Sequence, residues 1–344
     1  MSGRCSWLRA VVLISTVASA SGFLGAPAVA PNRAAQRSAM RLAPQHTRAT
    51  PKTVLRAAAG GEGGKVLAPA GAPHVLILPG FGNAQQDYIN PLSEGEERSV
   101  SYALRERGFS VYVMPLERIQ WLNVLRGIFT LSFWLRRTTP YEAAYGWYVE
   151  MGREAYRQAA SSGTGVLVVG HSAGGWLGRA VVGDGQWDVG GKTCGETLQG
   201  FVSLGAPHAP PPADAEGVSD MTFGALTWTD VNFPGAFLQK KGIPYVSVAS
   251  DLIQGVDPKA EQEAPSPNLA AYNSYRLVCG QGAVPGDGVV PLVSAHLEGA
   301  EQLTLKCYHS ISPSQDKWQQ LRGSWYGSDS VLDAWLRVYF ELKK

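Results

Sequence analysis

The sequence has few cysteines, no long uncharged apolar segment and no metal-binding motif. Four of its 344 residues are Cys, at spacings unlike those of zinc sites, and no H-E-x-x-H pattern occurs. No stretch reaches the roughly 18 apolar residues that a membrane-spanning helix needs. Gly-rich stretches lack the preceding strand and the Lys-Ser or Lys-Thr of a phosphate-binding loop. These absences predict a soluble or peripheral protein that uses neither a metal nor a cofactor.

Acidic residues are absent from the first 61 positions. Eight of the 30 basic residues precede Glu62, so the other 22 face all 28 acidic residues, and residues 62–344 carry a net charge of −6. The net charge of +2 for the whole chain therefore comes from its N-terminus. Nothing in this balance indicates a nucleic-acid partner.

The acid-free N-terminus has two parts. Residues 10–20 are apolar, follow two arginines and end in small residues, as a signal peptide does. Residues 21–61 have the Ala, Pro, Ser, Thr and Arg composition of an organelle transit peptide. We interpret residues 1–20 as a signal peptide and 21–61 as a transit peptide or disordered leader. The combination resembles the bipartite plastid leaders of algae with secondary plastids. The alternative is a secretory signal and a disordered linker on a secreted protein.

Three cysteines follow the leader, namely Cys194, Cys279 and Cys307. Their odd number argues against a disulfide framework. A Cys279–Cys307 redox pair is an alternative to three buried thiols, which the sequence favours.

Short apolar runs alternate with helical patterns from residue 65 to residue 344, the range expected to fold as one domain. The expected strands cover residues 74–80, 109–116, 165–170, 200–207, 243–250 and 301–309. The expected helices cover residues 94–107, 141–160, 174–182 and 328–342. This alternation is typical of βαβ units and predicts an α/β fold, a mostly parallel sheet with helices on both faces.

Two segments interrupt the alternation. Residues 117–140 are dense in aromatic and aliphatic side chains, and residues 208–240 are rich in Pro, Ala and Gly. Each follows the carboxyl end of an expected strand, where ligand sites gather in open α/β sheets. We predict that both are cap or lid segments.

The strongest chemical motif is Gly170-His171-Ser172-Ala173-Gly174, which matches G-x-S-x-G. It follows an apolar strand and opens a helix, which is the context that a nucleophile elbow requires. The alternative is a glycine-rich bend without chemistry. We interpret Ser172 as a nucleophile.

Four segments together resemble the α/β-hydrolase superfamily, and more narrowly its lipase-like plastid and cyanobacterial serine hydrolases. They are LILPGFGN (76–83), GHSAGGW (170–176), SLGAPH (203–208) and DGVVP (287–291). The resemblance covers roughly residues 73–312. It implies the α/β-hydrolase fold with cap or lid insertions, and a site whose residues follow the chain order Ser, acid, His.

The resemblance implies a base C-terminal to Ser172. His309 lies just beyond the last expected strand, where the superfamily places its base. His208 and His296 are the alternatives. His208 precedes any plausible acid, and His296 falls in a stretch that we expect to be helical.

Two aspartates are candidates for the acid. Asp287 lies in a Gly-flanked turn and carries the D-G-V-V-P match, so it is preferred as the partner of His309. Asp251 directly follows an expected strand and could instead cap a helix.

An acyl-transfer site also needs two preorganised N–H donors for the oxyanion. By resemblance these are the backbone N–H groups of Ala173 and Phe81, the latter in the loop PGFGN.

The first interrupting segment indicates the substrate class. Its apolar body is bordered by arginines, which suits a lid that contacts an acyl chain or a lipid surface. The alternative is a cap helix packed on the sheet. The substrate or lid candidates in this segment are Trp121, Phe129 and Trp134. We therefore predict a serine esterase or lipase acting on lipid acyl esters, with peripheral membrane contact as a further expectation. The alternatives are an acyltransferase with the same triad and a non-catalytic binding protein on this fold.

Overall fold

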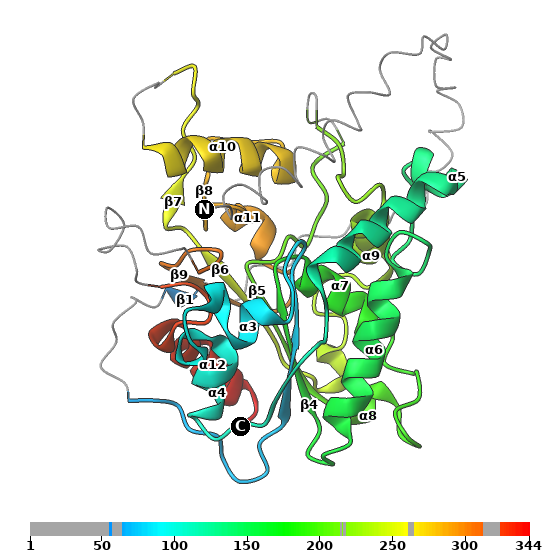
Figure 1. Cartoon of the computed structure of the whole chain (residues 1–344), viewed down its shortest axis with the longest axis vertical. Coiled ribbons are helices and arrows are strands. Elements are labelled where there is room, and N and C mark those ends of the chain that lie inside the picture. Colours follow the sequence, from blue (N-terminus) through cyan, green and yellow to red (C-terminus); the bar gives the residue numbers. More distant parts are fainter. Residues whose placement is uncertain (1–54, 57–63, 214, 216–217, 261–264, 312–323) are drawn as a thin grey trace. The chain divides into compact units, whose positions relative to one another are not determined.

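Seven parallel strands form the central sheet (Figure 1). Their order is β1-β9-β6-β5-β4-β2-β3, and every neighbouring pair is parallel. The strands are β1 (Leu55–Arg56), β2 (His74–Leu78), β3 (Val111–Val113), β4 (Val166–His171), β5 (Leu198–Leu204), β6 (Tyr245–Ser250) and β9 (Glu301–Leu305). The parallel sheet predicted from the apolar runs is confirmed.

The computed structural model describes residues 55–56, 64–213, 215, 218–260, 265–311 and 324–344. The predicted signal peptide and residues 21–54 and 57–61 of the predicted leader lie outside the described residues. Leu55 and Arg56 belong to that leader range, yet they pair with Leu303 and Thr304 of β9. At this edge the sheet therefore includes residues that precede the predicted domain start at residue 65.

Helices and short 3-10 turns connect the strands. The α-helices are α3 (Gln86–Ile89), α4 (Val100–Arg105), α5 (Leu131–Trp134), α6 (Gly146–Ala160), α7 (Ala173–Val182), α8 (Cys194–Thr197), α9 (Ala225–Asn232), α10 (Ser266–Cys279), α11 (Leu292–Ala295) and α12 (Asp329–Leu342). The 3-10 helices are η3 (Pro91–Ser93), η4 (Glu96–Arg98), η5 (Arg118–Phe129) and η6 (Gln239–Lys241). In the described ranges, none of these helices is long and apolar enough to cross a membrane.

The sheet is covered by helices on both faces, as expected. Successive side chains of a strand point to opposite faces. Leu76 and Val168 therefore pack in the core layer under α6 and α7, whereas Val75 and Leu167 pack in the layer under α4 and α12. Figure 1 shows α6 and α7 on one side of the strands and α4 and α12 on the other. Burial on both faces explains why the strands read as continuous apolar runs.

The helix predicted over residues 94–107 is shorter than expected. Gly95 has a φ of 123°, which no α-helix contains, and a 3-10 turn follows it. The Ser99 hydroxyl accepts the Tyr102 N–H at 3.0 Å and caps the N-terminus of α4. The α-helix therefore starts at Val100.

One helix that the sequence analysis missed supports the candidate site. The Tyr275 hydroxyl, on α10, donates to the carbonyl oxygen of Ile253 at 3.1 Å and accepts the Gly288 N–H at 2.7 Å. Ile253 lies in β7 (Ile253–Gln254), which pairs antiparallel with β8 (Pro285–Gly286) in a separate two-stranded sheet. Helix α10 thus fixes the turn that carries Asp287.

The two predicted cap segments, 117–140 and 208–240, contact each other. Phe133 stacks on Phe223 with ring centroids 3.8 Å apart. The Thr138 N–H donates to the carbonyl oxygen of Phe223 at 3.0 Å. Two separate stretches of the chain therefore build one structure outside the sheet.

Candidate active site

Ser172 occupies the turn between β4 and α7. Its φ of 52° and ψ of −127° lie outside the regions that residues with a side chain ordinarily adopt. The Ser172 N–H donates to the carbonyl oxygen of Leu204 on the adjacent strand at 2.9 Å. A Cβ added at Gly170 would collide with the backbone of Gly174, and one at Gly174 would collide with the backbone of Leu78. The flanking glycines therefore permit the turn, which leaves the serine half-buried.

The loop after β2 passes directly beside this serine. A Cβ added at Gly80 would lie 2.6 Å from the Cβ of Ser172 and 3.3 Å from its Oγ. The next N–H, that of Phe81, has no protein acceptor among the described residues. Ala173 is the first residue of α7, where N–H groups have no partner within the helix. The two predicted oxyanion donors therefore lie on segments that meet at Ser172.

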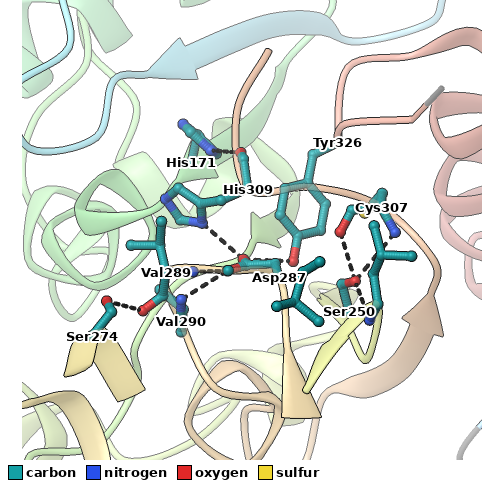
Figure 2. Close-up of polar contacts among 12 residues, drawn as sticks. His171, Ser250, Ser274, Asp287, Val289, Val290, Cys307, His309 and Tyr326 are labelled. Atoms are coloured by element: carbon teal, nitrogen blue, oxygen red, sulfur yellow. Dashed lines mark hydrogen bonds and ion pairs between the residues drawn. The ribbon is translucent and has the colours of Figure 1, made fainter. Parts of the chain in front are cut away.

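His309 and Asp287 form a buried pair (Figure 2). His309 Nδ1 lies 2.7 Å from Asp287 Oδ2, and the His309 backbone N–H donates to the Asp287 carbonyl oxygen at 3.0 Å. A carboxylate only accepts hydrogen bonds, so Nδ1 carries the proton and Nε2 is left as the acceptor. The structure thus brings together the preferred base and the preferred acid.

The Asp287 carboxylate accepts four hydrogen bonds (Figure 2). Oδ1 accepts the N–H groups of Val289 and Val290 at 2.9 and 2.7 Å, and Oδ2 accepts Tyr326 Oη at 3.0 Å in addition to His309. Burial raises the pKa of Asp287, but the interactions with His309 and with the two N–H groups outweigh burial, so the pKa lies below its ordinary value. The carboxylate is therefore held ionised and fixed in orientation.

Tyr326 is a site residue that the sequence analysis missed. It is fully buried on the segment before α12 and contacts the same oxygen as His309. It belongs to no motif. The one available signal is an aromatic cluster with a hydroxyl, Trp325-Tyr326, next to the terminal helix.

Ser172 and His309 are not hydrogen-bonded in the described part of the chain. His309 Nε2 is buried and has no hydrogen-bond partner there. Catalytic hydrogen bonds often form only when substrate closes the site, so this separation does not argue against a shared role. The structure therefore shows a hydrogen bond between Asp287 and His309 but none between His309 and Ser172.

The alternative site residues have other partners. His208 Nε2 lies 2.9 Å from Ser203 Oγ, and His296 Nε2 lies 2.9 Å from Thr304 Oγ1. Asp251 forms an ion pair of 2.9 Å with Lys306 Nζ. His296 follows the short helix α11 as its C-cap, so the expectation of a helical position was wrong by one residue.

His171, the residue before Ser172, is buried and hydrogen-bonded on both sides. Its Nδ1 lies 2.7 Å from Tyr88 Oη and its Nε2 lies 2.8 Å from the His309 carbonyl oxygen. Burial and the nearby His309 lower the pKa of His171 to about 3. The ring is therefore neutral near pH 7.

The three lid candidates occupy different environments. Trp121 is buried, its ring lies 4.9 Å from that of Phe81, and its Nε1–H donates to the Asn83 carbonyl oxygen at 2.9 Å. It therefore supports the loop after β2 rather than facing solvent. Phe129 and Trp134, in contrast, are 86% and 57% exposed.

The three cysteines are buried free thiols. Burial raises the pKa of Cys194 to about 12 and that of Cys307 well above its ordinary value. Thiols of this kind are poor nucleophiles, and the alternative Cys279–Cys307 disulfide is not formed. No group of His, Cys, Asp or Glu suited to a metal ion occurs within the described ranges.

The order of the strands and the position of the turns decide the fold. Ser172 follows β4 in the middle of the sheet, Asp287 lies in the connection between β6 and β9, and His309 follows β9. The chain has the α/β-hydrolase fold.

Comparisons with known proteins add little to this assignment. No protein-family model and no curated protein matches the chain. One similar structure is a soluble variant of monoglyceride lipase from Saccharomyces cerevisiae with a substrate analogue, at 12% identity over 79% of this chain and 86% of that one, with a TM-score of 0.33. Another is tomato methylketone synthase I with 2-tridecanone, at 11% identity over 79% and 96%, with a TM-score of 0.27. Because these TM-scores are low, the α/β-hydrolase fold rests on the topology.

Proposed function

We propose that the protein is a serine hydrolase that cleaves carboxylic esters, with Ser172 as nucleophile, His309 as base and Asp287 as acid. The observation that carries this proposal is the buried Asp287–His309 pair, which leaves one imidazole nitrogen unpartnered. Among the described residues, Nδ1 of His208 and Nδ1 of His296 are also buried without a partner, so the feature that sets His309 apart is the buried carboxylate on its other ring nitrogen.

The proposed reaction has two steps. Ser172 Oγ attacks the ester carbonyl carbon while its proton passes to His309 Nε2, and the bond to the alcohol breaks as that proton moves to the departing oxygen. Water then gives a proton to the same nitrogen, attacks the acyl carbon and releases the acid, and Ser172 regains its proton.

The remaining groups stabilise the charges that form during the reaction. Asp287 keeps Nδ1 protonated and stabilises the imidazolium that forms in each step. We assign the N–H groups of Phe81 and Ala173 to the developing oxyanion, for which one such donor contributes about 3 kcal/mol.

Covalent labelling tests this proposal. A fluorophosphonate probe should label the wild-type protein, and Ser172→Ala should abolish both labelling and hydrolysis of p-nitrophenyl butyrate. Ser203→Ala is the matched control, because the Ser203 hydroxyl contacts a histidine, His208 Nε2 at 2.9 Å, but is buried. An unlabelled wild-type protein, or labelling lost in the control instead, would contradict the proposal.

We further propose that the ester belongs to a lipid, because an exposed apolar ridge lies on the first cap segment. In a 3-10 helix, side chains three residues apart lie on one line. Trp121 and Val124 of η5 face the core, but the next line, Ile119, Leu122 and Leu125, is exposed. We define the apolar ridge as these three residues and four that follow: Phe129, Leu131, Trp134 and Leu135.

Charge around the ridge fits a lipid surface. Residues 118–141 contain no acidic residue, and the side chains of Arg126, Arg136 and Arg137 are exposed. Apolar side chains inserted at the headgroup boundary, with arginines near anionic headgroups, are the usual form of interfacial binding. Peripheral membrane contact is therefore part of the proposal.

Vesicle sedimentation tests this part separately. Phe129→Ser with Trp134→Ser should reduce binding to vesicles that contain anionic lipid and reduce hydrolysis of a vesicle-borne ester. Hydrolysis of a soluble short-chain ester should be unchanged. Leu67→Ser is the control, since Leu67 is 65% exposed outside the cap segments. Equal vesicle binding by all variants would contradict membrane contact.

We also propose that residues 1–61 direct the protein to a plastid, on their composition. A fluorescent protein fused to these residues should accumulate in plastids of an algal host, whereas secretion of the fusion would support the alternative leader.

A further inference from the structure

A buried chain of hydrogen bonds joins two loops of the candidate site. Tyr88 Oη, on α3, accepts the Gly80 N–H and the Asn83 side-chain amide, each at 3.0 Å. The same hydroxyl contacts His171 Nδ1, and His171 Nε2 contacts the His309 carbonyl oxygen. The chain therefore runs from the loop after β2, past Ser172, to the loop after β9; Figure 2 shows its last contact.

The direction of each hydrogen bond is fixed. A carbonyl oxygen only accepts, so His171 Nε2 carries the proton and donates to His309. The neutral ring then accepts at Nδ1, so the Tyr88 hydroxyl must donate to it and accept from Gly80 and Asn83. Every polar atom of the Tyr88 and His171 side chains is thereby bonded.

These hydrogen bonds connect three groups whose relative positions matter for the proposed reaction. Gly80 precedes the oxyanion donor Phe81, His171 precedes the nucleophile Ser172, and His309 is the base. Between the strands that carry the second and third of these groups lie β5 and β6, so no direct strand pairing sets their distance. Reacting groups must be held to within about half an ångström of their productive positions.

We propose that Tyr88 and His171 are positioning residues that set the oxyanion loop and the base loop relative to Ser172. This inference rests on the proposed serine hydrolase function. It assigns no contact with substrate to either side chain. Their effect on turnover passes through Gly80 at one end and through the His309 backbone at the other.

Tyr88→Phe is the most conservative test, because it removes one hydroxyl and keeps a ring that packs in the core. It should lower kcat for a soluble ester about tenfold, the effect of about 1.4 kcal/mol on a barrier, with KM within about twofold. Tyr156→Phe is the matched control, since that buried hydroxyl contacts Cys194 and Thr197 away from the site. The control should lower the urea midpoint similarly but keep kcat within about twofold. Equal kcat in the two variants would overturn the proposal.

Two substitutions at His171 test its two hydrogen bonds separately. His171→Asn has the length to keep the contact with Tyr88 but not the one with His309, and His171→Gln has the reverse reach. Each should lower kcat. If the two residues act through one network of hydrogen bonds, Tyr88→Phe combined with His171→Gln should lower kcat by less than the product of the two single effects. Effects that multiply would overturn the proposal.

Hydrogen exchange decides the matter without using activity. Tyr88→Phe should speed amide exchange both in peptides that contain Gly80 and in peptides that contain His309, although Tyr88 contacts only the first loop. Faster exchange at the first loop alone would overturn the inference. If the wild-type protein neither hydrolyses esters nor takes the probe, the proposed function fails, and this readout still decides whether the two loops are coupled.

Discussion

The two halves of the candidate site differ in how completely their hydrogen bonds are made. Around Asp287 every carboxylate oxygen is occupied, by donors from three segments of the chain. Around Ser172 the reverse holds: His309 Nε2 has no partner among the described residues, and the serine backbone is in a strained conformation. One half is closed and the other is open.

The surroundings of Asp287 therefore stabilise the fold, whereas the surroundings of Ser172 destabilise it. Fully bonded buried groups make a structure rigid, whereas strain and unpartnered atoms persist only when the surroundings hold them. An open half next to a closed one is what a reaction centre needs, because the reacting groups must change partners while the groups that orient them must not.

The largest expected effect comes from Ser172→Gly, in the open half. Glycine adopts a positive φ without strain, so the substitution should raise the free energy of unfolding by about 1–2 kcal/mol. It should also lower ester hydrolysis by about a factor of a million, because the nucleophile is gone. Urea unfolding and initial rates measure both. The control Ser203→Gly, in ordinary strand geometry, should destabilise the protein. A destabilised Ser172→Gly variant would remove the contrast between the two halves.

Asp287→Asn should act in the opposite sense on stability. It should lower kcat by about ten-thousandfold because the imidazole tautomer is no longer enforced, and lower the free energy of unfolding by about 1–3 kcal/mol because buried donors lose their acceptor. Asp251→Asn, at the alternative acid, should leave kcat near the wild-type value. Crippled activity in Asp251→Asn with an active Asp287→Asn would reverse the assignment of the acid.

Low pH should destabilise the protein because three of its histidines are buried in the neutral form. The pKa of His171 is lowered to about 3 and that of His296 to about 4, and the pKa of His208 lies well below its ordinary value, all mainly through burial. The unfolded chain takes up these protons near pH 6.5 and the folded chain does not, so stability is present above pH 6.5 and falls as the pH drops toward 4. The slope should approach 4 kcal/mol per pH unit, about 1.4 for each of the three groups.

Urea unfolding between pH 7.5 and pH 4.5 measures this slope. His296→Asn should reduce it by about a third, because one of the three protons is removed from the balance. A free energy of unfolding that stays constant over this range would contradict the neutral state of the buried histidines.

The smallest expected effect is that of Tyr326→Phe, which removes one of the four donors to Asp287. The other three remain, so kcat should fall only about fivefold and stability by about 1 kcal/mol. Initial rates with a soluble ester and urea unfolding measure the two effects. An unchanged kcat would show that Tyr326 only fills space.

Most of the sheet and the turn at Ser172 could be predicted because they depend on short stretches of sequence. An apolar run before G-x-S-x-G specifies a buried strand and a sharp turn locally, and the order of the following motifs limits where the acid and base can lie. The structure places Asp287 and His309 together, although Asp251, His208 and His296 also had to be considered.

The remaining contacts could not be predicted because they depend on packing between distant segments. Tyr88 reaches His171 across 83 positions, and Tyr326 reaches Asp287 across 39. Neither tyrosine has a local pattern that separates it from a core aromatic. A cap helix was the alternative for the segment that contains η5, but its 3-10 type was not predicted, since the three-residue period differs from both the α-helical and the strand periods.

The period of η5 also constrains how its length can change. Its buried and exposed lines repeat every three residues, so a gain or loss of three residues inside the helix keeps Trp121 and its line on the core and the apolar line outside. A gain of one residue would turn the polar line that contains Gln120 and Asn123 toward the core downstream of the change, and a loss of one residue would turn the exposed apolar line there and the buried line outward. Length variants of this segment that still fold should therefore differ in steps of three.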